Sequence, residues 1–182
     1  MEDVIGTESI VGTPSTLRES ELEAVLHKER SRAFGIAWRL TGGNRELAED
    51  VIQEAMVKAY LKLASLKDER RMDSWFFQIV VREAHSQTRR RRIGRRILEL
   101  FRWGHEGLQN ETRSDPGLSN RIGQALGELS QGQREVFVLV HLSGFQLNEA
   151  ARVLGKAEGT IKTQLHRATH RMRKKLGDIP RE

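Results

Sequence analysis

Two clusters of side chains in this sequence have the chemistry of nucleic-acid contact, and the first lies near the C-terminus. If residues 158–175 form one helix, its apolar residues share one face: Ile161, Leu165, Ala168 and Met172. The residues left for the other face are Glu158, Thr160, Lys162, Thr163, His166, Arg167 and His170. Lys and Arg bind phosphates or guanine, Thr reaches base edges and Glu accepts from cytosine. We therefore predict that this helix reads DNA.

A short helix and a tight turn precede the reading helix. Residues 149–154 supply the short helix, and Gly155 stands where a left-handed helix C-cap is needed. This is the layout of a helix-turn-helix, in which the second helix enters the major groove. An amphipathic hairpin with a solvated basic face has the same spacing, so the pattern alone leaves both interpretations open.

The second cluster, residues 73–92, combines rings with positive charge. Trp75, Phe76 and Phe77 are followed by polar positions and by four consecutive arginines, 89–92. Unstacked bases lie on aromatic rings while cations follow the phosphates, which is how single-stranded nucleic acid is bound. The alternative is structural: we expect Trp75 and at least one Phe to lie in the core, and the arginines can serve as a solvated helix end.

Other kinds of chemistry find little support. His166 and His170 are four residues apart, but the Glu of a zinc-protease motif is absent, and the six histidines are otherwise scattered. The sequence has no cysteine, no phosphate-binding loop and no convincing carboxylate cluster, so a nuclease is disfavoured. We expect no metal, no cofactor and no enzymatic activity.

Charge and hydropathy agree with a nucleic-acid partner. Lys and Arg number 31 against 25 Asp and Glu, a formal net charge of +6, which favours a polyanion such as nucleic acid or an anionic membrane surface. No run approaches the roughly 20 apolar residues that a membrane-spanning helix needs. Residues 1–20 lack the basic and apolar regions of a signal peptide, so we expect a cytoplasmic protein.

Helical signals run through the first half of the chain. A capping box, Ser20 with Glu23, predicts the start of a first helix that ends at the turn 41–43. Asn44 is the predicted cap of a second helix, which has one apolar and one acidic face. Asp73 is the predicted cap of a third helix that runs into the arginines.

Glycines and a proline interrupt residues 93–120, which predicts a linker with one helical piece around 97–103. A second capping box, Ser130 with Gln133, opens a helix that Gly144 ends. The predicted fold is all-α, with two small helical domains joined by a flexible linker. The predicted boundaries are an arm over 1–16, a first domain over 17–92, the linker over 93–120, a helix-turn-helix domain over 121–176 and a tail over 177–182.

Three segments, taken together, resemble the extracytoplasmic-function (ECF) sigma factors of bacterial RNA polymerase. Residues 39–63, with Ala48-Glu49-Asp50 and Gln53-Glu54-Ala55, are similar to the family's polymerase-binding helix. Residues 73–92, with Trp75 near the helix start, are similar to its promoter-melting and minus-ten element. Residues 125–176, with Gln133-Arg134-Glu135 and Gly159-Thr160-Ile161-Lys162, are similar to its second conserved domain.

The resemblance implies a subunit that directs core polymerase to the promoters of a stress- or signal-responsive regulon and helps to open them. It implies that the clamp coiled coil of core polymerase binds Glu49, Asp50, Gln53, Glu54 and Lys58. The implied minus-ten and melting contacts are Lys67, Arg70, Arg71, Trp75, Arg82, His85, Ser86, Arg89 and Arg90, with the loop 65–71 capturing a flipped base. The implied minus-thirty-five contacts are Glu158, Gly159, Thr160, Lys162, Thr163, His166 and Arg167.

The resemblance also implies partners beyond polymerase and promoter DNA. An anti-sigma factor is expected, and it could hold the otherwise nucleoid-associated protein at the membrane. The alternative from another class is a stand-alone helix-turn-helix regulator, which would bind duplex DNA without polymerase. Such a regulator needs neither residues 48–55 nor the segment of rings and arginines.

Overall fold

The computed structural model describes residues 14–101 and 118–177, and every regular element within them is a helix. The first half forms α1 (Pro14–Leu40), α2 (Arg45–Lys62) and α3 (Met72–Phe101), with the 3₁₀ turns η1 (Leu63–Ser65) and η2 (Glu69–Arg71) between α2 and α3. The second half forms α4 (Leu118–Glu128), α5 (Gln131–Phe137), the π-helical turn η3 (Val138–Leu142), α6 (Leu147–Leu154) and α7 (Glu158–Leu176). The all-α prediction is confirmed.

Several predicted caps are found in the structure. The Asn44 side chain accepts a hydrogen bond from the Leu47 backbone N–H at 2.7 Å. Ser130 and Gln133 form the capping box of α5. Gly155 ends α6 with φ +62° and ψ +37°, a left-handed conformation that a residue with a Cβ rarely adopts.

Three predicted helix boundaries are wrong. α1 begins at Pro14 and not at Ser20, because a proline is well tolerated in the first turn of a helix. Asp73 lies inside the first turn of α3, since η2 runs directly into that helix and Asp68 caps η2 instead. α3 continues through Gly94 to Phe101, past the predicted start of the linker, because a single glycine weakens a helix by only about 1 kcal/mol.

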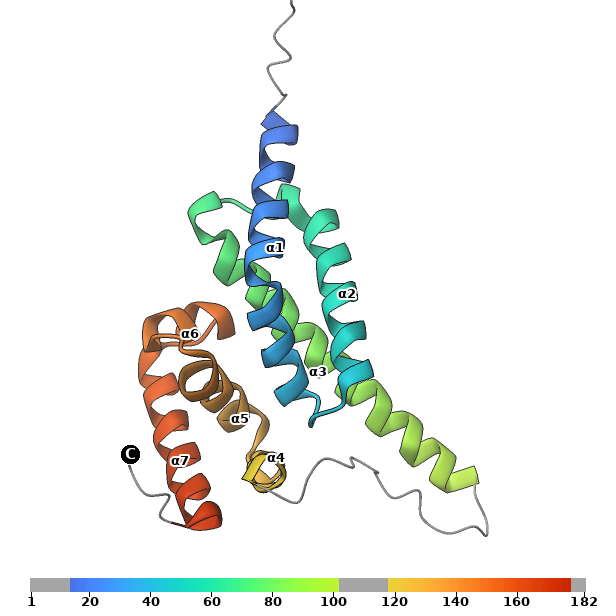
Figure 1. The fold of residues 1–182 in the computed structure, drawn as a ribbon, viewed down its shortest axis with the longest axis vertical. Coiled ribbons are helices and arrows are strands. Elements are labelled where there is room, and N and C mark those ends of the chain that lie inside the picture. Colours follow the sequence, from blue (N-terminus) through green and yellow to red (C-terminus); the bar gives the residue numbers. More distant parts are fainter. Residues whose placement is uncertain (1–13, 102–117, 178–182) are drawn as a thin grey trace, which may run out of the picture.

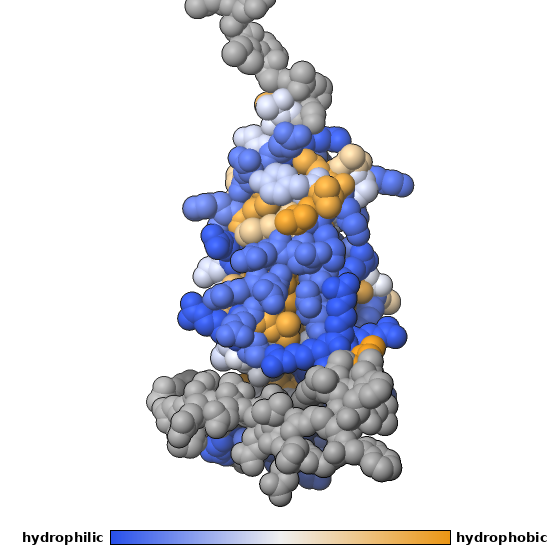
Figure 2. Space-filling view, turned by 90° about the vertical axis from the view of Figure 1, so that its right-hand side faces the viewer, coloured by the Kyte–Doolittle hydropathy of each residue, from blue (hydrophilic) through white to orange (hydrophobic). Residues whose placement is uncertain are grey.

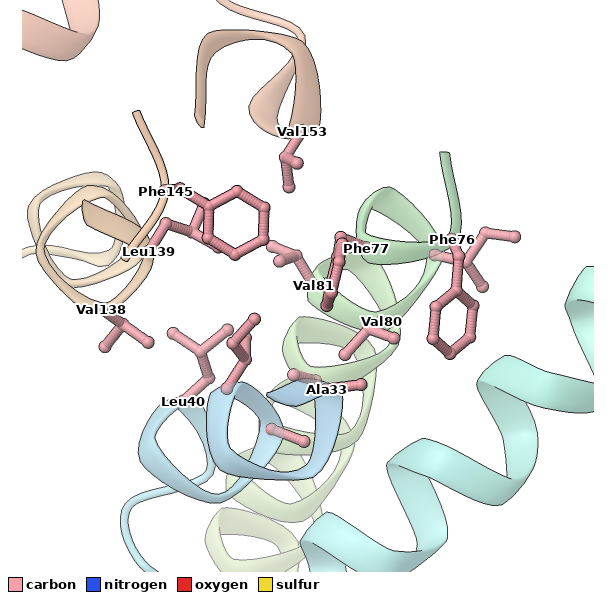
Figure 3. Packing of buried hydrophobic residues seen from close by; sticks show 14 of the residues in the cluster. Ala33, Leu40, Phe76, Phe77, Val80, Val81, Val138, Leu139, Phe145 and Val153 are labelled. Carbon is pink, nitrogen blue, oxygen red and sulfur yellow. The ribbon is translucent and has the colours of Figure 1, made fainter. Parts of the chain in front are cut away.

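The helices pack as two groups that share one hydrophobic core. α1, α2 and α3 form a bundle whose α2 seam is built from small or branched residues, Ala48, Val51, Ile52, Ala55 and Ala59. Figure 1 shows the second group lying beside the first, where α6 packs against α3 and η3 packs against α1. At this junction Phe145 packs edge-on against Phe77, with ring centroids 4.9 Å apart (Figure 3). The two predicted domains are therefore in contact in this conformation.

Candidate nucleic-acid interface

The predicted reading helix, α7, presents the expected face to solvent. Ile161, Ala168 and Met172 are buried, which fixes the rotation of the helix. All seven predicted minus-thirty-five residues are exposed: Glu158, Gly159, Thr160, Lys162, Thr163, His166 and Arg167. The Thr163 hydroxyl donates to the Gly159 carbonyl at 2.9 Å, which leaves its oxygen able to accept. The geometry is compatible with groove binding, while the base contacts remain predictions.

The predicted polymerase-binding residues share α2 but do not share one environment. Glu49, Asp50 and Gln53 are exposed, and Arg45 pairs with Glu49 at 2.9 Å. Lys58 instead turns toward the bundle, where its ammonium pairs with the carboxylate of Glu83 and lies 3.2 Å from Glu54. The hydrogen bond to Glu83 is the largest cause of the raised pKa of Lys58. Lys58 is thus engaged within the fold.

The C-terminal half of α2 exposes apolar side chains that sequence reasoning did not single out. Val57, Tyr60 and Leu61 are 54%, 44% and 78% exposed. Figure 2, which faces this side of the molecule, shows an apolar patch ringed by polar residues. Large apolar residues on the solvent face of an otherwise amphipathic helix were the available signal, because such patches on monomers commonly mark interaction sites.

The predicted melting element surrounds a small cavity. Lys67, Arg70 and Arg71 are exposed in and before η2, and Trp75 is half-buried beside them. A cavity of about 320 Å³ is lined by Lys67, Asp68, Arg71, Trp75 and Gln78, with Arg152 of α6 closing one side. Phe76 and Phe77 are fully buried, which confirms the expectation that at least one Phe lies in the core. The same expectation for Trp75 is wrong, because this ring packs against the core but stays half-buried. Of the three rings, Trp75 is the one that remains partly exposed beside the loop 65–71.

On the rest of α3, the predicted DNA-facing residues divide into two groups. Arg82, Arg89 and Arg90 are exposed. His85 and Ser86 are half-buried, because the second domain covers this part of the helix.

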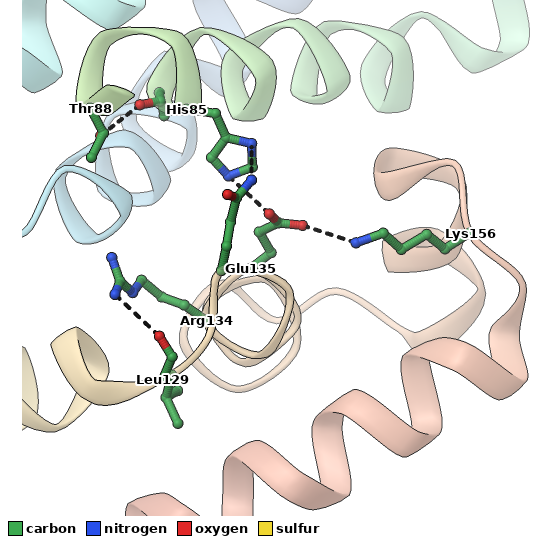
Figure 4. Close-up of polar contacts among 8 residues, drawn as sticks. His85, Thr88, Leu129, Arg134, Glu135 and Lys156 are labelled. Carbon is green, nitrogen blue, oxygen red and sulfur yellow. Dashed lines mark hydrogen bonds and ion pairs between the residues drawn. The ribbon is translucent and has the colours of Figure 1, made fainter. Parts of the chain in front are cut away.

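The carboxylate of Glu135 contacts side chains from both domains at this position. Glu135 of α5 is 4% exposed, and its Oε1 lies 3.0 Å from His85 Nε2 of α3 (Figure 4). Its Oε2 lies 3.3 Å from Lys156 Nζ, in the turn before α7. Burial alone would raise the pKa of Glu135, but the hydrogen bond and charge of His85 and the charge of Lys156 outweigh it, so the pKa is lowered. The ionised carboxylate therefore links both domains.

Further contacts close the same junction. Arg32 of α1 donates from Nε to the Ser143 carbonyl at 3.0 Å, and its guanidinium carbon lies 3.7 Å from the centroid of the Phe145 ring. Gln78 donates to the Arg152 carbonyl at 2.8 Å. Sequence reasoning could not place these pairs, since each joins residues far apart in the chain.

The described residues contain neither a candidate metal site nor a helix suited to span a membrane. Within them, no group of three or more His, Asp or Glu side chains is arranged to hold a metal ion. None of the described helices combines the length and apolar character needed to cross a bilayer.

Comparison with known proteins gives two matches to family models, in the predicted order. The model for sigma-70 region 2 matches residues 25–93, and the model for sigma-70 region 4 matches residues 119–172. The chain is 32% identical over 163 residues to ECF RNA polymerase sigma factor EcfG of Rhodopseudomonas palustris, covering 86% of this chain and 83% of the relative. It is 27% identical over 162 residues to ECF RNA polymerase sigma factor SigW of Bacillus subtilis, covering 82% and 86%.

Solved structures agree. The sigma factor RpoE in complex with the anti-sigma factor NepR from Bartonella quintana is similar with a TM-score of 0.64 at 30% identity, covering 90% of this chain and 98% of that one. CnrH in complex with the cytosolic domain of CnrY is similar with a TM-score of 0.62 at 25% identity, covering 87% and 93%.

Proposed function

The chain belongs to the ECF RNA polymerase sigma factors, which are transcription initiation factors and not enzymes, and we propose that separate exposed surfaces bind core polymerase and promoter DNA. Its first domain binds core polymerase and melts the minus-ten region, while its second domain reads the minus-thirty-five element. The observation that carries the proposal is the match to both sigma regions in one chain, in the order that the two sets of motifs require.

We propose that polymerase docks on the solvent face of α2, with the clamp coiled coil as its contact. The exposed acidic and amide groups of Glu49, Asp50 and Gln53 support this in a chain whose net charge is +6, because an acidic face on a basic protein favours a protein partner over DNA. Glu54 adds a half-buried carboxylate. The contribution of Lys58 is indirect, since it holds Glu54 and Glu83 together.

We propose that the cavity beside Trp75 takes the flipped non-template base. Unstacking a base costs a few kcal/mol, and a pocket that fits only certain bases offsets that cost selectively. We expect Arg71, which lines the cavity, and its exposed neighbour Arg70 to meet the flanking phosphates. Arg152 of the second domain also lines this cavity, so the shape of the cavity depends on the contact between the domains.

We propose that the exposed face of α7 enters the major groove at the minus-thirty-five element. Lys162 and Arg167 supply positive charge, and Glu158 and Thr160 stand near the helix N-terminus, where recognition helices meet base edges. We also propose an anti-sigma factor as a regulatory partner, because the structurally similar sigma factor RpoE was solved with the anti-sigma factor NepR bound, and the similar protein CnrH with the cytosolic domain of CnrY bound. Such a sigma factor acts in the cytoplasm at the nucleoid, or is held at the membrane by that partner.

The test is transcription with purified components. The chain is added to sigma-free core polymerase and genomic DNA fragments, and transcripts whose starts depend on it are sequenced. Discrete starts with shared upstream elements are expected. Their absence, together with a failure to bind core polymerase, would overturn the proposal in favour of a stand-alone regulator.

A matched pair of variants assigns the polymerase surface. Asp50→Ala should weaken core binding about tenfold, the equivalent of about 1.4 kcal/mol. Glu21→Ala removes an exposed acid from α1 and should leave core binding unchanged. Equal losses in both variants would mean that general charge, and not this face of α2, determines the affinity.

A further inference from the structure

The junction between the two domains contains a cleft whose lining is basic. A cavity of about 920 Å³ lies between α3 and the α4–α5 corner, close to the polar contacts of Figure 4. Its charged lining consists of Arg82, Arg89 and Arg92 from α3 and Arg134 from α5, with His85 at the domain contact. Among the described residues that line it, none is Asp or Glu. Two surfaces of the same sign therefore face one another across a space large enough for a ligand.

The α3 arginines have no partner among the described residues. Arg82, Arg89 and Arg92 make none of the ion pairs or hydrogen bonds found there, whereas the nearby carboxylate of Glu135 is already held by His85 and Lys156. Three cations on one helix face, spaced seven and three residues apart, thus converge on the cleft without compensation.

Arg134 supplies a fourth cation from the other domain. Its Nε donates to the Leu126 carbonyl at 2.8 Å, and its Nη2 donates to the Gly127 carbonyl at 2.9 Å. Within the described chain it has no carboxylate at ion-pair distance. Carbonyl oxygens orient the guanidinium but leave its full charge at the edge of the cleft.

Like charges brought together across a closing interface repel one another, and partial burial strengthens the repulsion because water is removed. An anion in the cleft would replace this repulsion between the arginines with attraction to the anion. Guanidinium groups match phosphate oxygens two at a time, which makes arginine the preferred residue for phosphate. A volume of about 920 Å³ is within the range of small-molecule sites and exceeds the need of a single phosphate.

We propose that this cleft binds a small anion that carries several phosphates, and that the bound anion holds the two domains together. Because three cations come from α3 and one from α5, the complete site exists only while the domains are in contact. By linkage, a ligand that binds only this conformation increases its population. Given the proposed function, the anion would compete with promoter DNA for Arg82 and Arg89.

Phosphates could also reach these arginines from a nucleic-acid backbone, which would need α3 alone. The two sources differ in their dependence on domain contact. When the junction is weakened, the protein binds a small anion that needs both domains less tightly. A nucleic-acid backbone that needs only α3 reaches the arginines more easily.

The experiment is calorimetric titration of the full-length chain with inorganic tripolyphosphate at constant ionic strength, using Arg92→Ala and Arg91→Ala. Both residues are exposed neighbours on α3, but only Arg92 lines the cleft. We expect one site, an affinity about tenfold weaker in Arg92→Ala, and an affinity within about twofold of the original in Arg91→Ala. Equal losses would overturn the proposal, because they would show diffuse attraction to the arginine run.

Junction variants distinguish the two sources of phosphate. Phe145→Ala and Arg32→Ala weaken the domain contact without changing the lining of the cleft. A folded variant of either kind, checked by circular dichroism, should bind tripolyphosphate several-fold more weakly. Undiminished binding would assign the phosphates to α3 alone and overturn the two-domain site. The titration contains no polymerase or promoter, so its outcome is independent of the transcription experiment.

Discussion

His85 Nε2 of α3 lies 3.0 Å from Glu135 Oε1 of α5, and this pair joins the two domains, with Glu135 buried and His85 half-buried. The Gln131 amide nitrogen lies 3.0 Å from His85 Nδ1, on the other side of the ring from Glu135. Lys156 holds the other carboxylate oxygen. The predicted melting helix and the turn before the predicted reading helix therefore share one buried charge.

Glu135→Gln should destabilise this closed arrangement. The amide keeps the shape but loses the charge that His85 and Lys156 contact, and hydrogen bonds to charged groups contribute about 1.5 to 3 kcal/mol. We expect a loss of about that size in the free energy of unfolding, measured by urea denaturation.

The matched control is Glu128→Gln. Glu128 pairs with Lys175 at 2.8 Å, but both side chains are more than half exposed, and exposed pairs contribute about 0 to 1 kcal/mol. If the two variants lose equal stability, the Glu135 carboxylate is not the link that the geometry indicates.

Acid should reproduce the effect of the Glu135 substitution. His85 and Lys156 face the carboxylate from α3 and from the turn before α7, and Arg134 is its neighbour on α5. Burial raises the pKa of Glu135, but His85, Lys156 and Gln131 outweigh it and hold that pKa below its ordinary 4.5. The stabilisation is therefore present above that value and is lost as the pH falls through the folded-state pKa. The stability difference between the original chain and Glu135→Gln should shrink in buffers more acidic than that value. A difference that grows on acidification would contradict this assignment.

The sequence predicts those features that depend on neighbouring residues. Asn44, Ser130 and Gly155 cap their helices through contacts within a few residues, and the apolar spacing of α7 sets its buried face. Helix starts are less certain, because Pro14 and Ser20 are both reasonable first-turn residues and the local sequence does not decide between them.

Contacts between distant residues were beyond that kind of reasoning. His85 has the pattern of a DNA-facing residue on a polar helix face, and nothing in its neighbourhood indicates that Glu135 will cover it. Lys58 likewise continues the exposed charge pattern of α2, yet it is long enough to reach the buried Glu83 of α3. The periodicity of the sequence indicates which face of a helix is polar. Which residues contact that face depends on how the whole chain folds.

The Phe145 ring should be a principal contributor to domain contact. It lies between the Arg32 guanidinium and the edge of Phe77 and is 6% exposed. Replacing a buried Phe by Ala typically costs about 3 to 5 kcal/mol. Small-angle scattering of Phe145→Ala should show a larger radius of gyration if the helices themselves remain folded. Phe145→Leu retains most of the apolar volume and should show an intermediate effect, and an unchanged radius in both variants would argue against this role.

The Lys58–Glu83 pair tests how much stability the first domain loses when a buried carboxylate has no counter-charge. Glu83 is 3% exposed, and its Oε1 has no hydrogen-bond partner among the described residues. Lys58→Met should therefore be strongly destabilising, about 3 to 5 kcal/mol, because it leaves a buried carboxylate without its counter-charge. The double variant Lys58→Met with Glu83→Leu should recover much of that loss, which thermal or urea unfolding will measure. Additive losses would mean that the two side chains do not depend on each other.

The exposed face of α7 gives the most direct test of promoter reading. Arg167 is exposed and makes no ion pair among the described residues, so it is available for a DNA phosphate or a base. Arg167→Ala should weaken binding of the polymerase complex to its promoters, and if the contact is to a phosphate, the slope of log affinity against log salt should fall by about 1. Arg173→Ala removes the same charge two turns later, at an exposed position outside the predicted contacts, and should have a smaller effect. If Arg167→Ala changes the salt slope no more than Arg173→Ala, the recognition surface lies elsewhere on the second domain.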